Sequence, residues 1–108
     1  MKITKGDKML AKVLIKRQFK PGHTQEIVAL LNDMRSVAMG QPGYLSGLTL
    51  MEPENPSKML VISTWQTLED WNNWKSNGQR IHLESLLDVY QNVPTQYEAY
   101  VVGTGFSQ

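Results

Sequence analysis

The chain changes its periodicity abruptly within residues 59–74, which read MLVISTWQTLEDWNNW. The aliphatic and β-branched residues in the first half of this segment are typical of a half-buried strand. Thr67 then precedes Asp70 by three positions, which is the spacing of a helix N-cap and an acid in the first turn. Trp71 and Trp74 are also three apart, so a helix places both on one face. The segment therefore predicts a strand followed directly by an aromatic helix. Its large side chains either fill the core or form the wall of a pocket.

The other segments of regular structure are separated by turn and breaker residues. In chain order we expect a strand at 9–19, a helix at 24–39, strands at 44–52 and 58–65, the aromatic helix, a helical piece at 79–90 and a strand at 97–103. Residues 53–57 contain two prolines and predict a turn without ladder hydrogen bonds, so the flanking strands form a hairpin.

Periodicity also assigns faces to some of these elements. In the strand at 44–52, alternation places Tyr44, Leu48 and Leu50 on one face. In the first strand, an apolar face is interrupted near its end by Arg17. The helical piece at 79–90 has these apolar positions: Ile81, Leu86, Leu87 and Tyr90.

The elements follow the order β-α-β-β-α-β, which is that of the ferredoxin-like α+β fold. Four antiparallel strands would form one layer, and the helices would cover one face of the sheet. The opposite face would still carry Leu or Met at several positions, which is too much apolar surface for water. We therefore expect a homodimer in which two copies pack sheet to sheet. The 108 residues predict a single domain at 1–108, with its core at about 9–103.

Composition and charge exclude several classes of function. The net charge is +1 and the charges are spread along the chain, so no surface for nucleic acid and no polybasic membrane-binding segment is expected. The lack of cysteine excludes disulfides, thiolate metal sites and a cysteine nucleophile. The two histidines, His23 and His82, lack metal-site spacing, so no metal is expected. With no signal-peptide pattern and no run of about 18 apolar residues, we expect a cytoplasmic protein without membrane contact.

Four motifs of this chain resemble those of a known family. They are GYLSGLTL at 43–50, VISTWQTLEDWNNW at 61–74, the following Arg80, and YEAYVV at 97–102. From about residue 9 to residue 102, the chain is similar to the antibiotic-biosynthesis-monooxygenase (ABM) family. These motifs are specific for membership and not for one reaction. The resemblance implies a dimeric α+β barrel, with a pocket in each subunit between the sheet and its helices.

Members of this family carry out several kinds of chemistry. They include cofactor-independent oxygenases of polyketide anthrones and quinols, haem-degrading enzymes, and isomerase-like or aldolase-like enzymes. The anthrone and quinol enzymes need no metal or flavin, because the deprotonated, electron-rich substrate itself reduces dioxygen. The protein then has to deprotonate the substrate, orient it and keep water out of the cavity. The resemblance therefore implies that no cofactor is required.

The motif of the haem-degrading branch can be compared residue by residue. It has an Asn on the first strand, a Trp on the helix after the third strand, and a haem-ligating His ten positions after that Trp. Here Trp74 matches the Trp, but Glu84 stands at the His position and Ile15 at the Asn position. Only a shifted helix register would bring the nearby His82 inward. Haem degradation is therefore not expected.

Two residues are candidates for catalysis. His82 can exchange a proton near neutral pH, and its alternative is a surface histidine on an amphipathic helix. Arg17 can hold a carboxylate, phenolate or oxyanion through parallel hydrogen bonds. Its alternative is a solvated strand end paired with an acid such as Asp33 or Glu98. His23 follows a Pro-Gly pair and is expected to be an ordinary turn residue.

Four aromatic residues are candidates for substrate binding. Trp65, Trp71 and Trp74 can stack on a flat ligand, with Trp74 the preferred one, or they can fill the core. Trp65, at the end of its strand, is more consistent with packing. Tyr44 offers a hydroxyl to a phenolic substrate, and it is also typical of the edge of a core.

Three functions remain open at this point, because one fold can host many. The leading hypothesis is a cofactor-independent monooxygenase of ABM type that acts on a small aromatic, quinol-like or phenolic substrate. His82 or an ordered water would remove the proton, and Arg17 or a tyrosine would stabilise the anion. The second hypothesis is a non-catalytic binding module for an aromatic ligand or haem. The third is a structural protein whose packed tryptophans leave no cavity.

Overall fold

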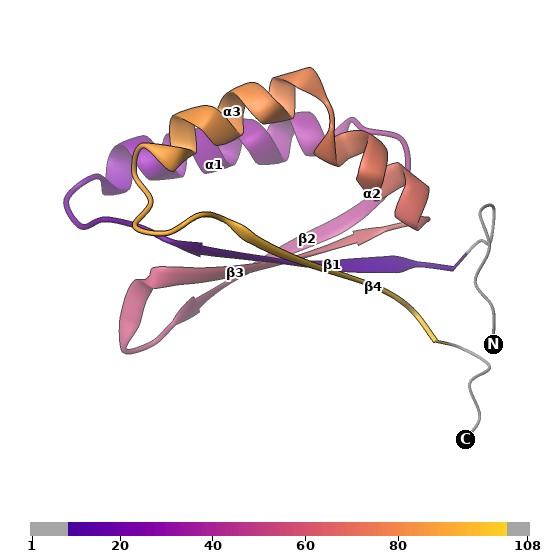
Figure 1. Ribbon diagram of the computed structural model, residues 1–108, viewed down its shortest axis with the longest axis horizontal. Helices are drawn as coiled ribbons and strands as arrows, with labels where there is room; N and C mark the ends of the chain where they lie inside the picture. Colours follow the sequence, from indigo (N-terminus) through magenta and orange to yellow (C-terminus); the bar gives the residue numbers. More distant parts are fainter. Residues whose placement is uncertain (1–8, 104–108) are drawn as a thin grey trace.

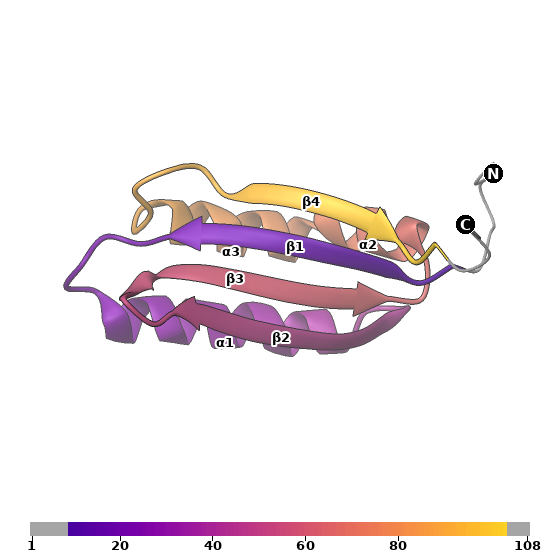
Figure 2. The same ribbon diagram turned by 90° about the horizontal axis from the view of Figure 1, so that it is seen from below.

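The computed structural model describes residues 9–103 and forms one antiparallel sheet with helices on one of its faces (Figure 1). The strands are β1 (Ala11–Gln18), β2 (Tyr44–Glu52), β3 (Asn55–Trp65) and β4 (Gln96–Val101). The helices are α1 (Thr24–Met39), α2 (Leu68–Lys75) and α3 (Gly78–Asp88). The strands lie in the order β2-β3-β1-β4 (Figure 2). This confirms the predicted ferredoxin-like α+β fold, in which the second helix is divided into α2 and α3.

The central strand β1 alternates between buried and more exposed residues, as its sequence predicts. Ala11, Val13 and Ile15 are buried and form one core cluster with residues of α1 and with Leu87 of α3. Arg17 lies on the same inward face and is only 4% exposed. Because burial of a charge is costly unless it is paired, this position requires partners inside the protein.

Capping residues begin both short helices, and the first of them, Thr67, is the one that the sequence predicts. Oγ1 of Thr67 accepts a hydrogen bond from the backbone N–H of Asp70 at 3.1 Å, at the start of α2. Oδ1 of Asn77 accepts from the backbone N–H groups of Gln79 and Arg80, at 2.9 and 3.2 Å, at the start of α3. These side chains satisfy backbone donors that have no partner within the helix.

The predicted faces of β2 are wrong. Strict alternation placed Tyr44 on one face with Leu48 and Leu50, but the pairing with β3 shifts by one residue between Tyr44 and Ser46. This β-bulge makes Leu45 an extra residue and interrupts the alternation. Tyr44 therefore lies on the helix-covered face, whereas Leu48 and Leu50 are exposed on the open face.

The third strand begins earlier than predicted. Asn55 already pairs with Glu52, so the hairpin turn is confined to residues 53–54 and the predicted turn at 53–57 is wrong. The last strand ends at Val101, short of the predicted end at Gly103. These differences change the ends of strands and leave the topology as predicted.

The predicted apolar face of α3 is wrong in part. Leu87 is fully buried, but Ile81 and Leu86 are 55% and 40% exposed. The inward side carries Arg80, which is 3% exposed, and the largely buried Glu84. Positions 80, 84 and 87 share one side of a helix, so two charged residues lie on the inward side together with Leu87 and the partly buried Leu83.

The face of the sheet opposite the helices carries aliphatic side chains in register across three strands. Leu14 of β1 lies opposite Ile62 of β3, which lies opposite Leu48 of β2. Leu60 and Leu50 form a further pair. Within residues 9–103, no helix covers this face (Figure 1), and none is long and apolar enough to cross a membrane. The homodimer that would bury this face stays a prediction.

Candidate functional site

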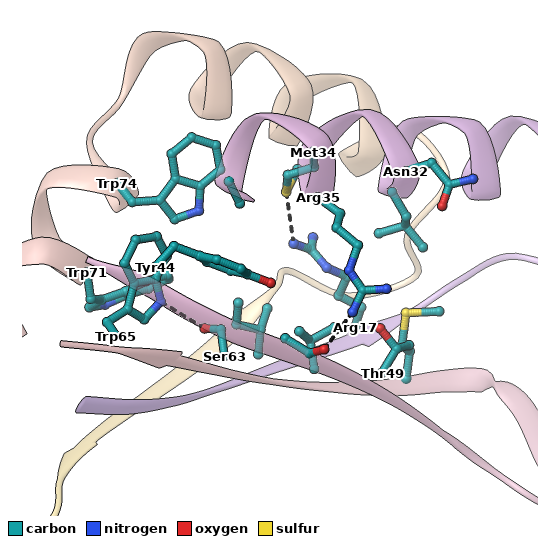
Figure 3. Close-up of a pocket in the computed structure, with 16 residues that line it drawn as sticks. Arg17, Asn32, Met34, Arg35, Tyr44, Thr49, Ser63, Trp65, Trp71 and Trp74 are labelled. Carbon is teal, nitrogen blue, oxygen red and sulfur yellow. Dashed lines mark hydrogen bonds between the residues drawn. The ribbon is translucent and has the colours of Figure 1, made fainter. Parts of the chain in front are cut away.

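A cavity of about 120 Å³ lies between the helix-covered face of the sheet and helices α1 and α2. Its two ends differ in chemistry (Figure 3): three tryptophans gather at one end, and Arg17 and Arg35 lie at the other. The lining residues Asn32, Arg35 and Thr49 are exposed, so the cavity opens to solvent between α1 and the edge strand β2. The hypothesis of a packed interior without a cavity is therefore wrong.

Trp65 is fully buried at the centre of the tryptophan end. Its ring stacks on Trp74 with centroids 6.5 Å apart and meets the ring of Tyr44 edge-on at 5.3 Å. Its Nε1–H donates to Oγ of Ser63 at 3.2 Å, which satisfies the polar atom of a buried indole. Trp71 completes the group, with its ring 6.1 Å from Trp65. The four rings give this end of the cavity a rigid aromatic wall.

Arg17 is held inside the protein by several partners. Its Nη1 donates to Oε2 of Glu84 at 3.0 Å and its Nη2 donates to Oε1, which forms a two-point ion pair. Nη1 also donates to Gln91 and Thr95, at 3.2 and 3.3 Å, and Nη2 donates to the sulfur of Met34 at 3.7 Å. The Nε–H is buried without a partner among the described residues. Arg17 lines the cavity, but this nitrogen itself is buried, so a ligand oxygen meets it only if the side chain shifts.

Glu84 is shared by two buried arginines. Besides pairing with Arg17, it accepts a hydrogen bond from Nη2 of Arg80 at 3.3 Å. Arg80 also donates to the hydroxyl of Tyr97 at 2.6 Å, and its guanidinium lies over the ring of Trp71 at 5.5 Å. Two cations therefore share one carboxylate, and the cluster keeps an excess of positive charge beside the cavity.

Gly47 leaves room for two polar groups near the mouth of the cavity. A Cβ at this position would lie 2.7 Å from the hydroxyl of Tyr44 and 3.5 Å from Nη2 of Arg35. That Nη2 donates to the carbonyl oxygen of Gly47 at 2.6 Å. Within residues 9–103, the Tyr44 hydroxyl has no hydrogen-bond partner and Arg35 has no ion-pair partner. Tyr44 extends toward the two arginines (Figure 3), so its hydroxyl is available for a hydrogen bond to a ligand.

The lining of the cavity provides donors and cations but no side chain that is an ordinary general base. None of the sixteen lining residues is Asp, Glu or His. In the part of the chain that the structure describes, no three His, Asp or Glu residues are grouped to hold a metal ion. The arrangement therefore favours stabilisation of an oxygen anion, and the interaction is strongest at Arg17, which is buried.

The structure brings most of the predicted site residues together. Five of them line the cavity: Trp65, Trp71, Trp74, Tyr44 and Arg17. His82 is exposed on α3 and does not line the cavity. His23 is exposed at the start of α1, where its ring packs on that of Tyr90 at 5.1 Å. The alternative position for Arg17, at a solvated strand end paired with Asp33 or Glu98, is wrong because the residue is buried and pairs with Glu84.

The sequence alone does not single out Arg35, and it does not indicate Glu84 as the partner of Arg17. Arg35 lies on the border of the polar face of α1, which is an ordinary place for a surface arginine. For Glu84 a local signal existed, because it stands four positions after Arg80, the spacing of a helical ion pair. No local sequence pattern indicates that Glu84 pairs with Arg17, because 67 residues separate the two in the chain.

Residues 11–82 match the model of a protein family described as antibiotic biosynthesis monooxygenase, which covers more than half of the chain. A conserved protein from Methanosarcina mazei Go1 has a similar structure, with a TM-score of 0.80 and 19% identity over 86% of this chain and 92% of that chain. SnoaB, a cofactor-independent oxygenase from Streptomyces nogalater, has a TM-score of 0.78 and 10% identity over 93% of this chain and 99% of its own. No curated protein matches the sequence. At these identities, the two structures show a shared fold.

Proposed function

This chain belongs to the antibiotic biosynthesis monooxygenase family, and we propose that it is a cofactor-independent monooxygenase of a small aromatic substrate that is quinol-like or phenolic. One observation carries the proposal: the cavity joins a wall of indole rings to the guanidinium groups of Arg17 and Arg35, and one N–H donor of the buried Arg17 has no partner among the described residues. The rings suit a flat, electron-rich substrate. The donors suit the oxygen anion that such a substrate forms when it loses a proton.

In the first step, the substrate hydroxyl loses its proton at the cationic end of the cavity. The Nε–H of Arg17 and the hydroxyl of Tyr44 donate hydrogen bonds to the phenolate oxygen. The excess positive charge shared by Arg17, Glu84 and Arg80, together with that of Arg35, lowers the pKa of the substrate hydroxyl. Because no carboxylate or imidazole lines the cavity, the proton passes to water at the open end.

In the second step, the phenolate reduces dioxygen without a cofactor. One electron passes to O₂, and the resulting phenoxyl radical and superoxide combine to form a C–O bond at a ring carbon. This carbon then loses its proton while the O–O bond breaks, so one oxygen atom stays as a carbonyl and the other leaves as water. A phenol and dioxygen thus give a quinone and water, and no external reductant is needed. The indole rings hold the substrate and keep bulk water from the radicals.

Oxygen uptake tests this proposal. Purified protein is mixed with a panel of phenols and quinols, and the rate is compared with autoxidation in buffer alone. With isotopically labelled dioxygen, we expect one labelled atom in the quinone and one in water. Tyr44→Phe removes one donor and should lower kcat about tenfold, whereas His82→Ala, outside the cavity, should leave kcat unchanged. Rates no higher than autoxidation with every compound contradict the proposal.

The same cavity suits a second function, which is binding of an aromatic ligand without turnover. The lack of a carboxylate or histidine in the lining favours this alternative, because a binding module needs no proton acceptor. It predicts that quinols quench tryptophan fluorescence without any oxygen uptake. Measuring both signals on the same sample distinguishes the enzyme from the binding module.

We also propose that two copies of the chain associate through the open face of the sheet. Aliphatic residues from three strands lie in register on this face, namely Leu14, Leu48, Leu50, Leu60 and Ile62. A domain of this size has a limited core, so burial of a second apolar face adds substantially to its stability. The helices lie on the other face, so this association leaves the mouth of the cavity between α1 and β2 unblocked by the sheet-to-sheet contact.

A further inference from the structure

The cavity has the size of one aromatic ring. Its volume is about 120 Å³, and an engineered cavity of ~150 Å³ in another protein holds one benzene molecule. We propose that the substrate is a single-ring phenol or hydroquinone that carries a carboxylate, with its hydroxyl at Arg17 and its carboxylate at Arg35. This inference rests on the proposed function in that it assumes the same cavity and the same position for the phenolate.

At the cationic end of the cavity, Arg17 is the more buried of the two arginines, and it suits a single oxygen atom. Both Nη atoms of Arg17 are already engaged by Glu84 and neighbouring residues, and only the Nε–H is free. A carboxylate is held best by two parallel N–H groups, and Arg17 does not offer such a pair. One N–H, with the Tyr44 hydroxyl as a second donor, matches the lone oxygen of a phenolate.

The mouth of the cavity suits a carboxylate. Nη2 of Arg35 is fixed by its hydrogen bond to the carbonyl oxygen of Gly47, which holds the guanidinium in place. The other N–H groups of Arg35 have neither acceptor nor ion-pair partner among the described residues. They form a planar fork that matches carboxylate geometry. Because Arg35 is exposed, the carboxylate keeps part of its hydration and the cost of desolvation stays low.

The charges of the site match this ligand. No acid lines the cavity, so one excess positive charge from the Arg17 cluster and one from Arg35 face any ligand. A neutral ring would compensate neither charge. A phenolate that also carries a carboxylate compensates both, one at each position.

Calorimetric titration under nitrogen tests the ligand class separately from turnover. The probes are hydroquinone, its carboxylate derivative gentisate, and a three-ring dihydroxyanthrone. We expect gentisate to bind about tenfold more tightly than hydroquinone and the anthrone to bind more weakly than either. Arg35→Gln should abolish the preference for gentisate, and Arg35→Lys should retain part of it. Lys20→Gln removes the same charge from an exposed turn and should retain the full preference.

The outcomes test three statements separately: the role of Arg35, the single-ring class of the ligand and the proposed function. Equal binding of gentisate and hydroquinone, or a preference that survives in Arg35→Gln, overturns the role of Arg35. Tighter binding of the anthrone overturns the single-ring class. Binding of gentisate that depends on Arg35 but gives no oxygen uptake supports this inference and contradicts the proposed function. Oxygen uptake with the anthrone and with no single-ring compound contradicts this inference and supports the proposed function.

Discussion

Arg17 of β1 donates hydrogen bonds from both Nη atoms to the carboxylate oxygens of Glu84 on α3, although 67 residues separate the two in the chain. Their side chains are only 2% and 13% exposed. Because both Nη atoms are engaged, the plane of the guanidinium is fixed, and so is the direction of its free Nε–H. Glu84 is thus a positioning residue, which acts on a ligand through Arg17.

Replacement of Glu84 tests the importance of this pair for stability. Glu84→Gln keeps the shape of the side chain but leaves two buried guanidinium groups without a counter-charge. We expect the free energy of unfolding to fall by about 3 kcal/mol, as is typical when a buried ion pair loses one partner. Urea denaturation measures the change. Glu26→Gln, at an exposed position on α1, is the control and should cost less than about 0.5 kcal/mol. Equal stability of the two variants would show that the buried pair contributes little.

Gly47→Ala tests the role of the space beside Tyr44. The new Cβ would lie 2.7 Å from the Tyr44 hydroxyl, so the ring has to move and its hydroxyl leaves its place in the cavity. We expect phenolic ligands to bind about tenfold more weakly, because one hydrogen bond to an anion is lost. In Gly40→Ala the nearest atom to the Cβ is a carbonyl oxygen at an ordinary 3.7 Å, and the affinity should not change. Calorimetry compares both variants with the parent, and unchanged affinity in Gly47→Ala would remove Tyr44 from the site.

A charge on the open face of the sheet tests the proposed dimer. Leu48 is 55% exposed there, and Leu48→Lys would place an ammonium group within the apolar surface that two copies share. We expect this variant to be a monomer by light scattering, because an unpaired charge in an interface is costly. Val28→Lys is the control, since Val28 is 48% exposed on α1 and lies away from that face. A monomeric parent protein, or a Leu48→Lys variant that still dimerises, contradicts the proposal.

Glu98 predicts a small dependence of stability on pH. The hydrogen bond and the charge of Lys16, at 3.1 Å, lower the pKa of Glu98 below its ordinary value, and the hydroxyl of Tyr100 contributes further. Since this pKa is lower in the folded protein, the carboxylate stabilises the fold above the ordinary pKa, and this contribution is lost as the pH falls through the lowered pKa. Glu98→Gln should therefore be slightly less stable than the parent at neutral pH and equally stable in strong acid.

The difference between the urea midpoints of the two proteins, followed from neutral to acidic pH, measures this effect. Because the pair is exposed, added salt should also reduce the difference. A difference that stays constant across the pH range would mean that Glu98 acts through packing and not through its charge.

Local periodicity was sufficient to predict most of the fold. The alternation of β1, the N-cap at Thr67 and the spacing of Trp71 and Trp74 each depend on neighbours in the chain, and the structure confirms all three. The aromatic wall of the cavity followed from the same spacing. Arg17 was identifiable because it interrupts an apolar face, and a charged side chain on a buried face needs charged or polar partners.

The features that local periodicity missed depend on contacts between distant segments. The bulge that turns Tyr44 toward the cavity depends on how β2 pairs with β3, and no pattern within β2 indicates it. The inward position of Glu84 depends on Arg17, which no helical periodicity can reveal. Once the inner side of α3 is occupied in this way, His82 lies toward solvent, because it is two positions from Glu84.

Helix α3 contributes no residue to the lining of the cavity, yet it supplies the carboxylate that fixes Arg17. The shape of the cavity is thus determined by α1, α2 and the sheet, while its electrostatic potential depends on a helix that a ligand does not touch. Within this fold, the shape of the cavity and its electrostatic potential can therefore vary independently. Substitutions in α2 or β2 change which ring fits, and substitutions in α3 change the ionisation that the bound ring adopts.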